Sequence, residues 1–257
     1  MNKITAAEFL KIINKKDEIQ ILRNYDLSGQ NLEFIDLQNW QLENINFSDT
    51  KMTGANLQST KMSNVNFQNA DLTKSWLTNS EITNSSFNNS QLQVANCAGV
   101  KMNSIDFSFS NLDFANFSNS IIEDIAFSNT CCTSSNFDRA VLKNVTFNFA
   151  ELKGIILSNS EIDTQILVDH NLENADLSWL CFEGFDLRNT NLKSALMYGC
   201  NLKNTNLQDL NLSRVDFSFA DLSGANLNGS DLTHIIIENT NLKNVTFEGC
   251  RMHAVAH

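Results

Sequence analysis

Apolar residues recur at every fifth position along almost the whole chain. From Leu27 to Met252 this position holds Leu, Phe, Met, Ile or Cys in 46 consecutive units, without one insertion. Two residues earlier, most units carry a small or β-branched residue, such as Ala55, Ala70 or Ala115. A step of five suits neither an α-helix, whose apolar positions would spiral round the axis, nor a straight strand, where an odd step changes face. The pattern therefore predicts a chain that turns a corner every five residues and keeps both positions inward.

The residues two positions after each central apolar residue have the composition of turns. All 9 glycines of the chain fall there, Asn fills sixteen more of these positions, and proline is absent from the sequence. Gly and Asn are the residues that best tolerate the positive φ of a type II turn. We therefore expect the corners at this position.

The spacing of the phenylalanines gives the number of sides. Six of them recur every twenty residues and would stack as a ladder of rings in successive coils: Phe47, Phe67, Phe87, Phe107, Phe127 and Phe147. Twenty residues make four five-residue sides, and stacked coils rise by the strand spacing of about 4.8 Å. The prediction is an all-β solenoid, a quadrilateral parallel β-helix of about 11.5 coils.

Several segments carry a motif of a small residue, then Asp or Asn, then Leu or Phe, then two polar residues. GANLQ at 54–58, NADLT at 69–73 and SFADLSGANLNGSDL at 218–232 are examples. This sequence resembles the pentapeptide-repeat proteins, and the resemblance covers residues 25–252. It implies a right-handed quadrilateral β-helix, and the hand comes from the resemblance alone.

Residues 1–24 precede the repeat and are expected to form a capping α-helix and a linker. Thr5 and Glu8 have the spacing of a capping box at a helix start. The apolar residues of this helix, which should close the first coil, are Phe9, Leu10, Ile12 and Ile13. Bulky residues replace small ones in the first coil and would fill the gap beneath the cap: Tyr25, Gln30 and Trp40.

The repeat domain, 25–252, has no comparable cap at its other end, and a short tail at 253–257 follows it. The last coil would leave unpaired backbone edges and exposed apolar side chains. We expect a homodimer in which two C-terminal ends join by two-fold symmetry. The candidate dimer end consists of Ile237, Leu242, Phe247 and Met252.

The sequence offers no catalytic, cofactor-binding or metal-binding residues. A filled solenoid leaves no concave site where a nucleophile and a base converge. The 6 cysteines form no CxxC pair, and the chain lacks a Walker loop, a GxGxxG element, a GxSxG elbow and an HExxH helix. We therefore expect a protein that is not an enzyme and needs no cofactor.

The net charge of -11 argues against direct binding of nucleic acid, which needs clustered Lys and Arg. Charged residues interrupt the N-terminal stretch, namely Lys11, Lys15, Lys16 and Asp17, so neither a secretion signal nor a membrane span is indicated. We expect a cytoplasmic location.

Gln165 and His170 are polar residues at the inward small position. Such side chains are expected either to bond the backbone of a neighbouring coil or to swing outward through a local distortion. The alternative is a recognition spot or a bend.

Aromatic residues occupy several corner positions in place of Gly or Asn: Phe34, Phe109, Phe114, Phe149, Trp179 and Phe219. A spacing of forty aligns Phe109 with Phe149 and Trp179 with Phe219. They are predicted either to form a partner surface or to fold back over the neighbouring coil. With two carboxylates expected on one face, the candidate partner surface is Phe109, Phe149, Trp179, Phe219, Asp176 and Asp216.

These features favour a protein-binding or scaffolding rod with an unidentified protein partner. Residues 161–231 carry a net charge of -7, and the resemblance includes acidic rods that protect DNA gyrase from quinolones. The first alternative is thus a DNA mimic that binds gyrase or another type II topoisomerase and protects it from quinolones or toxins. Leu196 between Asp176 and Asp216 breaks up any phosphate-like row. The second alternative is a translocated effector or a toxin-immunity factor.

Overall fold

The computed structural model describes residues 1–14 and 20–254. The chain divides into two compact units. The N-terminal unit comprises Met1–Asn136 and Ala140–Ala150, and the C-terminal unit comprises Phe137–Arg139 and Glu151–His257. Both units are built from the same five-residue repeat, so each is described in turn.

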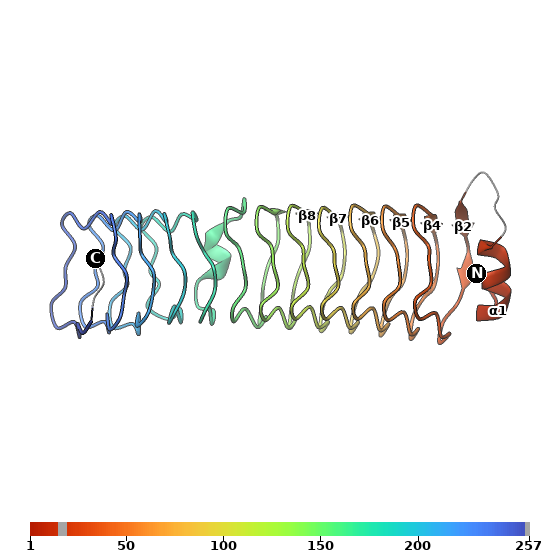
Figure 1. Ribbon diagram of the computed structural model, residues 1–257, viewed down its shortest axis with the longest axis horizontal. Helices are drawn as coiled ribbons and strands as arrows, with labels where there is room; N and C mark the ends of the chain where they lie inside the picture. Colours follow the sequence, from red (N-terminus) through yellow and green to blue (C-terminus); the bar gives the residue numbers. More distant parts are fainter. Residues whose placement is uncertain (15–19, 255–257) are drawn as a thin grey trace. The chain divides into compact units, whose positions relative to one another are not determined.

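The N-terminal unit contains a parallel sheet of 7 strands, in the order β2-β4-β5-β6-β7-β8-β9 (Figure 1). Each strand pairs with the one twenty residues away, as in the pairing of Leu42 with Met62 and of Met62 with Ile82. The strands are β2 (Ile21–Arg23), β4 (Gln41–Glu43), β5 (Lys61–Ser63), β6 (Glu81–Thr83), β7 (Lys101–Asn103), β8 (Ile121–Glu123) and β9 (Val141–Lys143). The predicted parallel solenoid is therefore confirmed.

The other three sides of each coil pair through single parallel bridges. Between the coils of β4 and β5, for example, the bridges are Asn46 to Asn66, Lys51 to Asp71 and Asn56 to Trp76. One strand pair and three bridges per twenty residues confirm the four sides. In the C-terminal unit the same step continues through bridges alone, such as Asp176 to Leu196 and Asn201 to Asp221.

The strands of the large sheet mark 7 turns, all in the N-terminal unit, fewer than the 11.5 coils predicted for the whole repeat. The described coils of the C-terminal unit add no strand to this number, because they pair through single bridges. Only the β2 to β9 side pairs over three residues, whereas the remaining sides pair at one residue each.

The interior is filled by the two apolar positions of each five-residue repeat, as predicted. The phenylalanine ladder of the N-terminal unit runs from Phe47 to Phe147, with ring centroids 4.8 to 5.5 Å apart in successive coils. All six rings are at most 1% exposed. Stacked aromatic pairs contribute about 0.5–1.5 kcal/mol each beyond their burial.

The corners lie where the sequence placed them. Nearly every residue two positions after a central apolar residue has a left-handed backbone, with φ between 48° and 75° for Asn, Gly and other residues alike. A carboxylate or amide at the position before the central residue often accepts the backbone N–H two residues later, as Asp106 does from Ser108 at 2.9 Å.

Helix α1 (Ala6–Ile13) covers the first coil (Figure 1). The predicted capping box is present, since Thr5 accepts from the N–H of Glu8 and Glu8 accepts from the N–H of Thr5. The ring of Phe9 is fully buried and packs edge-on against Phe47, with centroids 6.4 Å apart. Gln30, one of the bulky first-coil residues, accepts a hydrogen bond from the N–H of Ala6 at 2.9 Å.

One short strand next to α1 was not predicted. β1 (Asn2–Lys3) pairs in parallel with β3 (Tyr25–Asp26). β1 thus adds one further strand to the side of the first coil that contains β3. Two residues are too few to show a strand pattern in the sequence.

The repeat is interrupted once in the C-terminal unit, at the 3-10 helix η1 (Thr164–Leu167). Gln165 is exposed there and Thr164 is buried in its place, with its hydroxyl donating to the carbonyl of Cys181. His170 is half-exposed, and its Nδ1 lies 3.0 Å from the carbonyl oxygen of Val168. Gln165 thus points outward at a local distortion, which is one of the two outcomes expected for it, while His170 lies beside the backbone of its own coil.

Candidate binding surfaces

The six corner aromatics combine two unfavourable properties. Each has a left-handed φ, between 56° and 70°, and each is 48% to 86% exposed. A bulky side chain with positive φ costs about 1–2 kcal/mol relative to a right-handed backbone, a cost that Gly avoids and Asn reduces. The residues concerned are Phe34, Phe109, Phe114, Phe149, Trp179 and Phe219. Turn formation alone therefore does not account for their presence.

Trp179 and Phe219 belong to one continuous aromatic cluster. The indole of Trp179 folds over Gly199, where a Cβ would lie 2.5 Å from the indole Cε3. It meets Tyr198 edge-on, with centroids 5.4 Å apart, and Tyr198 meets Phe219 at 5.0 Å. The indole therefore folds back over the next coil, which is one of the two sequence-based alternatives, and it remains 57% exposed.

Tyr198 links these rings but was missed from the sequence. It lies one residue after a central apolar position, where polar residues usually stand, and so it does not belong to the pattern of aromatic corner residues. Its spacing of nineteen from Trp179 and twenty-one from Phe219 was the available signal.

Asp176 and Asp216 stand in one column of the C-terminal unit, each three residues before a ring of this cluster in the same coil. Parallel bridges connect Asp176 to Leu196, Leu196 to Asp216 and Asp216 to Ile236, so acidic and apolar side chains alternate from coil to coil. The Oδ1 atoms of the two aspartates accept the N–H groups of the serines two residues later, at 3.0 and 2.9 Å. Within residues 1–14 and 20–254, neither carboxylate forms an ion pair with Lys or Arg.

Phe109 and Phe149 lie in the N-terminal unit and do not form a comparable cluster. Asn129 stands between them in the coil column, with φ of 55°. The rings are 58% and 86% exposed, and no ring contact of either is found among the described residues. The structure thus brings together Trp179, Phe219, Asp176 and Asp216, and leaves Phe109 and Phe149 as separate exposed rings.

The last coil of the C-terminal unit surrounds an apolar hollow of about 350 Å³. The proposed dimer residues form its rim, with Met252 52% exposed. The lining consists of Phe217, Leu222, Leu227, Leu232, Ile235, Ile237, Leu242, Phe247 and Met252.

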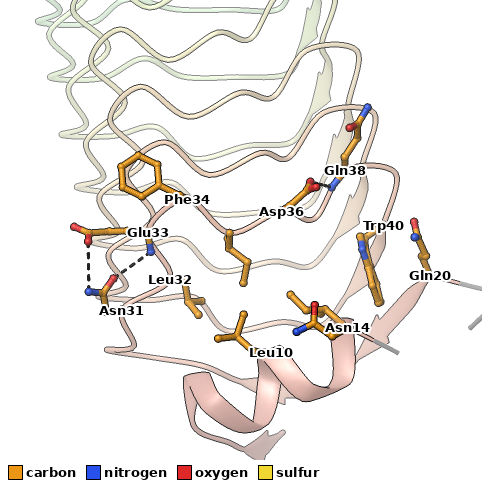
Figure 2. Close-up of a pocket in the computed structure, with 12 residues that line it drawn as sticks. Leu10, Asn14, Gln20, Asn31, Leu32, Glu33, Phe34, Asp36, Gln38 and Trp40 are labelled. Carbon is orange, nitrogen blue, oxygen red and sulfur yellow. Dashed lines mark hydrogen bonds between the residues drawn. The ribbon is translucent and has the colours of Figure 1, made fainter. Parts of the chain in front are cut away.

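A second hollow, of about 470 Å³, lies between α1 and the first coils of the N-terminal unit. Figure 2 shows Leu10 of α1 near Leu32 on one side of it, with Trp40 and Gln20 on the other. Its rim is acidic: Glu33 is held by Asn31, whose Oδ1 accepts the N–H of Glu33 at 3.1 Å. Leu10 is 44% exposed, so α1 buries Phe9 fully and leaves Leu10 at the edge of the hollow.

Three of the cysteines are buried in the core. Burial raises the pKa of the Cys132 and Cys200 thiols to about 12, and it raises that of Cys97 as well, so these thiols stay protonated at neutral pH. In the described parts of the chain, no group of three or more His, Cys, Asp or Glu residues is placed to hold a metal ion. None of the described helices is long and apolar enough to cross a membrane.

The family model described as pentapeptide repeats matches the chain in 8 copies, over residues 31–69, 60–93, 120–159, 171–209 and 211–249. Comparison with curated protein sequences finds no match.

The chain is similar to several proteins of solved structure. HetL, a pentapeptide repeat protein involved in heterocyst differentiation regulation from the cyanobacterium Nostoc sp., is 19% identical, with 98% of this chain and 94% of that chain covered and a TM-score of 0.32. Full-length QnrB1, a plasmid-mediated fluoroquinolone resistance protein, is 17% identical over 91% of this chain and 93% of that chain, with a TM-score of 0.22. A pentapeptide repeat protein from the Arabidopsis thaliana thylakoid lumen is 16% identical over 54% and 72%, with a TM-score of 0.24.

Proposed function

Because the chain belongs to the pentapeptide-repeat family, we propose that it is a non-enzymatic scaffold that binds a protein partner through side chains on its outer faces. The observation that carries this proposal is the set of exposed aromatic rings held on left-handed corners. Strained and exposed positions of this kind are common at binding sites, because folding alone would not favour them. The described interior is filled mainly by apolar side chains, which leaves the outer faces as the surfaces for binding.

The cluster around Trp179 is the strongest candidate surface. Aromatic residues are enriched among the side chains that dominate protein interfaces, because they bury large areas with few rotatable bonds. Phe109 and Phe149 supply a second candidate surface in the N-terminal unit. Asn substitutions remove these rings and retain a residue that suits the corner.

Affinity capture from a cell lysate with the immobilised protein tests the proposal. We expect the Trp179→Asn and Phe219→Asn double variant to lose the captured partner, with Phe109→Asn and Phe149→Asn testing the second surface. Phe34→Asn is the matched control and should keep full capture, because Phe34 also lies over a glycine, Gly54, on a left-handed corner but belongs to neither candidate surface. Full capture by every corner variant would show that the corners do not bind the partner.

The apolar hollow at the last coil supports a second part of the proposal, a homodimer. A second copy would cover the hollow by a two-fold contact that buries the same residues on both sides. Light scattering at high micromolar concentration should give the mass of a dimer, and Met252→Glu should shift it to the monomer. Ile121→Glu, at an exposed apolar residue on β8, is the control that should leave the mass unchanged. A monomeric mass for the unsubstituted protein would refute the dimer.

The gyrase-protecting alternative has less support. The acidic charge of residues 161–231 favours it, but Leu196 and Ile236 alternate with the aspartates on the face described above. A DNA mimic needs charges at each phosphate-like position. A gyrase supercoiling assay with and without a quinolone tests this alternative. If the protein neither inhibits nor rescues gyrase at tens of micromolar, the alternative is excluded.

A further inference from the structure

Six residues of the C-terminal unit form what we call the Trp179 face: Asp176, Trp179, Leu196, Tyr198, Asp216 and Phe219. They come from three successive coils, and the parallel bridges align those coils in register. Four of them stand just before or just after a central apolar residue and point outward on the same side of a coil, since the backbone alternates there as in a strand. Trp179 and Phe219 stand two residues after a central apolar residue, at the corner of that side. The face is thus one surface with aromatic and acidic parts.

The aromatic part of the face consists of rings that are held in place by contact with one another. Tyr198 contacts both Trp179 and Phe219, so the three rings form one continuous aromatic surface along the corner. Gly199 makes this arrangement possible, because any side chain there would displace the indole. Rings fixed in this way lose little conformational freedom when a ligand binds.

The acidic part provides two carboxylates in the column of outward residues next to the rings, one in the coil of Trp179 and one in the coil of Phe219. Asp176 and Asp216 are two coils apart, a separation of about 10 Å at the usual strand spacing. In each, Oδ1 is held by the turn, which fixes the carboxylate and leaves Oδ2 available to a ligand. Neither forms an ion pair within the described residues.

The ligand chemistry follows from this combination. A guanidinium stacks on aromatic rings and pairs with carboxylates, and its planar shape suits both contacts better than the ammonium of lysine does. Leu196, between the aspartates, is 45% exposed and suits an apolar side chain next to the cation. The net charge of -7 over residues 161–231 attracts cationic partners and repels nucleic acid and anionic membranes.

We infer that the Trp179 face binds a segment of a protein partner that carries arginine next to an apolar residue, with a guanidinium seated on the rings of Trp179, Tyr198 and Phe219 beside Asp176 or Asp216. This inference rests on the proposed function and specifies the partner's chemistry.

Fluorine NMR of the full chain labelled with fluorotryptophan tests it. The chain has 3 tryptophans, so the signals are assigned with single Trp→Phe variants. The probe is a capped peptide of sequence Arg-Leu-Gly-Leu-Arg, compared with the same peptide carrying citrulline, its neutral isostere, or lysine. We expect the arginine peptide to shift the Trp179 signal saturably, the lysine peptide to bind more weakly, and the citrulline peptide to bind at least about tenfold more weakly.

Trp76 is the internal control, because it is 54% exposed and lies in the other unit. Its signal should not move. The Asp176→Asn and Asp216→Asn double variant should weaken binding of the arginine peptide at least about tenfold, with an unchanged urea midpoint as the evidence that the C-terminal unit is intact. No saturable shift of Trp179 at millimolar peptide, or equal shifts at Trp76, would overturn the inference.

The outcome separates this inference from the proposed function. If the peptide has no effect but lysate capture still depends on Trp179, the face binds a partner of different chemistry and only the inference fails. If capture is also independent of all the corner aromatics, the proposed function fails as well.

Discussion

The indole of Trp179 lies directly over Gly199, one coil further along the C-terminal unit. A Cβ on residue 199 would approach the indole Cε3 to 2.5 Å and Cζ3 to 2.6 Å. The relationship depends on the twenty-residue register, which places a large corner residue above a corner without a side chain. Phe34 and Gly54 repeat it in the N-terminal unit, with two ring carbons at 2.7 Å from the position of the absent Cβ.

Gly199→Ala should therefore destabilise the protein more than Gly184→Ala does. Both residues have positive φ, +65° and +75°, so both substitutions carry a backbone cost of about 1 kcal/mol. Only residue 199 meets a ring, because nothing lies within 4 Å of a Cβ at residue 184. Urea unfolding measures the difference. In the Trp179→Asn background the extra cost should vanish, and its persistence would refute the contact.

Phe149→Asn should stabilise the N-terminal unit by about 1 kcal/mol, because the ring buries almost nothing while its backbone is left-handed. Phe149 is 86% exposed, with φ of 56°. The reciprocal substitution, Asn129→Phe in the same column, should cost a similar amount. A loss of stability in Phe149→Asn, measured as the free energy of unfolding in urea, would mean that the ring packs on the fold.

Ser80 and Ser120 occupy the same inward column but differ in their hydrogen bonds. The hydroxyl of Ser80 donates to the carbonyl of Leu77 at 2.6 Å, whereas that of Ser120 has no partner within the described structure. A buried hydroxyl without a partner costs about 1–3 kcal/mol, and a typical hydrogen bond contributes about 1 kcal/mol. Ser120→Ala should raise the unfolding free energy and Ser80→Ala should lower it by about 1 kcal/mol. Equal effects of the same sign would contradict the assignment.

The outer carboxylates predict how stability depends on pH. A hydrogen bond from the backbone N–H of Ser28 lowers the pKa of Asp26, and one from the hydroxyl of Thr233 lowers the pKa of Asp231. Because the folded pKa values lie below the unfolded value of about 3.9, these groups stabilise the fold above that pH. Their contribution is lost as the pH falls through the folded pKa values.

The urea midpoint should therefore be level near neutral pH and should fall below about pH 4. Asp26→Asn and Asp231→Asn, which keep an acceptor at the turn, should reduce this fall. A midpoint that stays constant or rises down to pH 3 would be inconsistent with the lowered pKa values.

The regular parts of the structure could be predicted because each residue type had one physical reason to occupy its position. The spacing of Phe47, Phe67 and Phe87 fixed the four sides, since rings stack only when coils repeat in register. The Thr5 and Glu8 pair fixed the start of α1. Asn and Gly marked the corners through their tolerance of positive φ.

The remaining features depend on contacts that a periodic pattern does not contain. Gln165 kept the inward phase in the sequence, yet η1 turns it outward and buries Thr164. Tyr198 joined Trp179 to Phe219 only because Gly199 leaves room for the indole. Such a contact involves three coils and one missing side chain, so single positions read in isolation did not reveal it.

The central claim is that every fifth residue is buried, so that the outward residues between them are available for binding. Substitutions at two neighbouring residues, one inward and one outward, test this claim most directly. Phe107 is fully buried, with Phe87 and Phe127 stacked on its two sides at 5.1 and 5.5 Å, whereas Ser108 lies on the outside. In urea unfolding, Phe107→Ala should cost roughly 3–5 kcal/mol, and Ser108→Ala less than about 0.5 kcal/mol. Similar costs for the two substitutions would contradict the division into inward and outward positions.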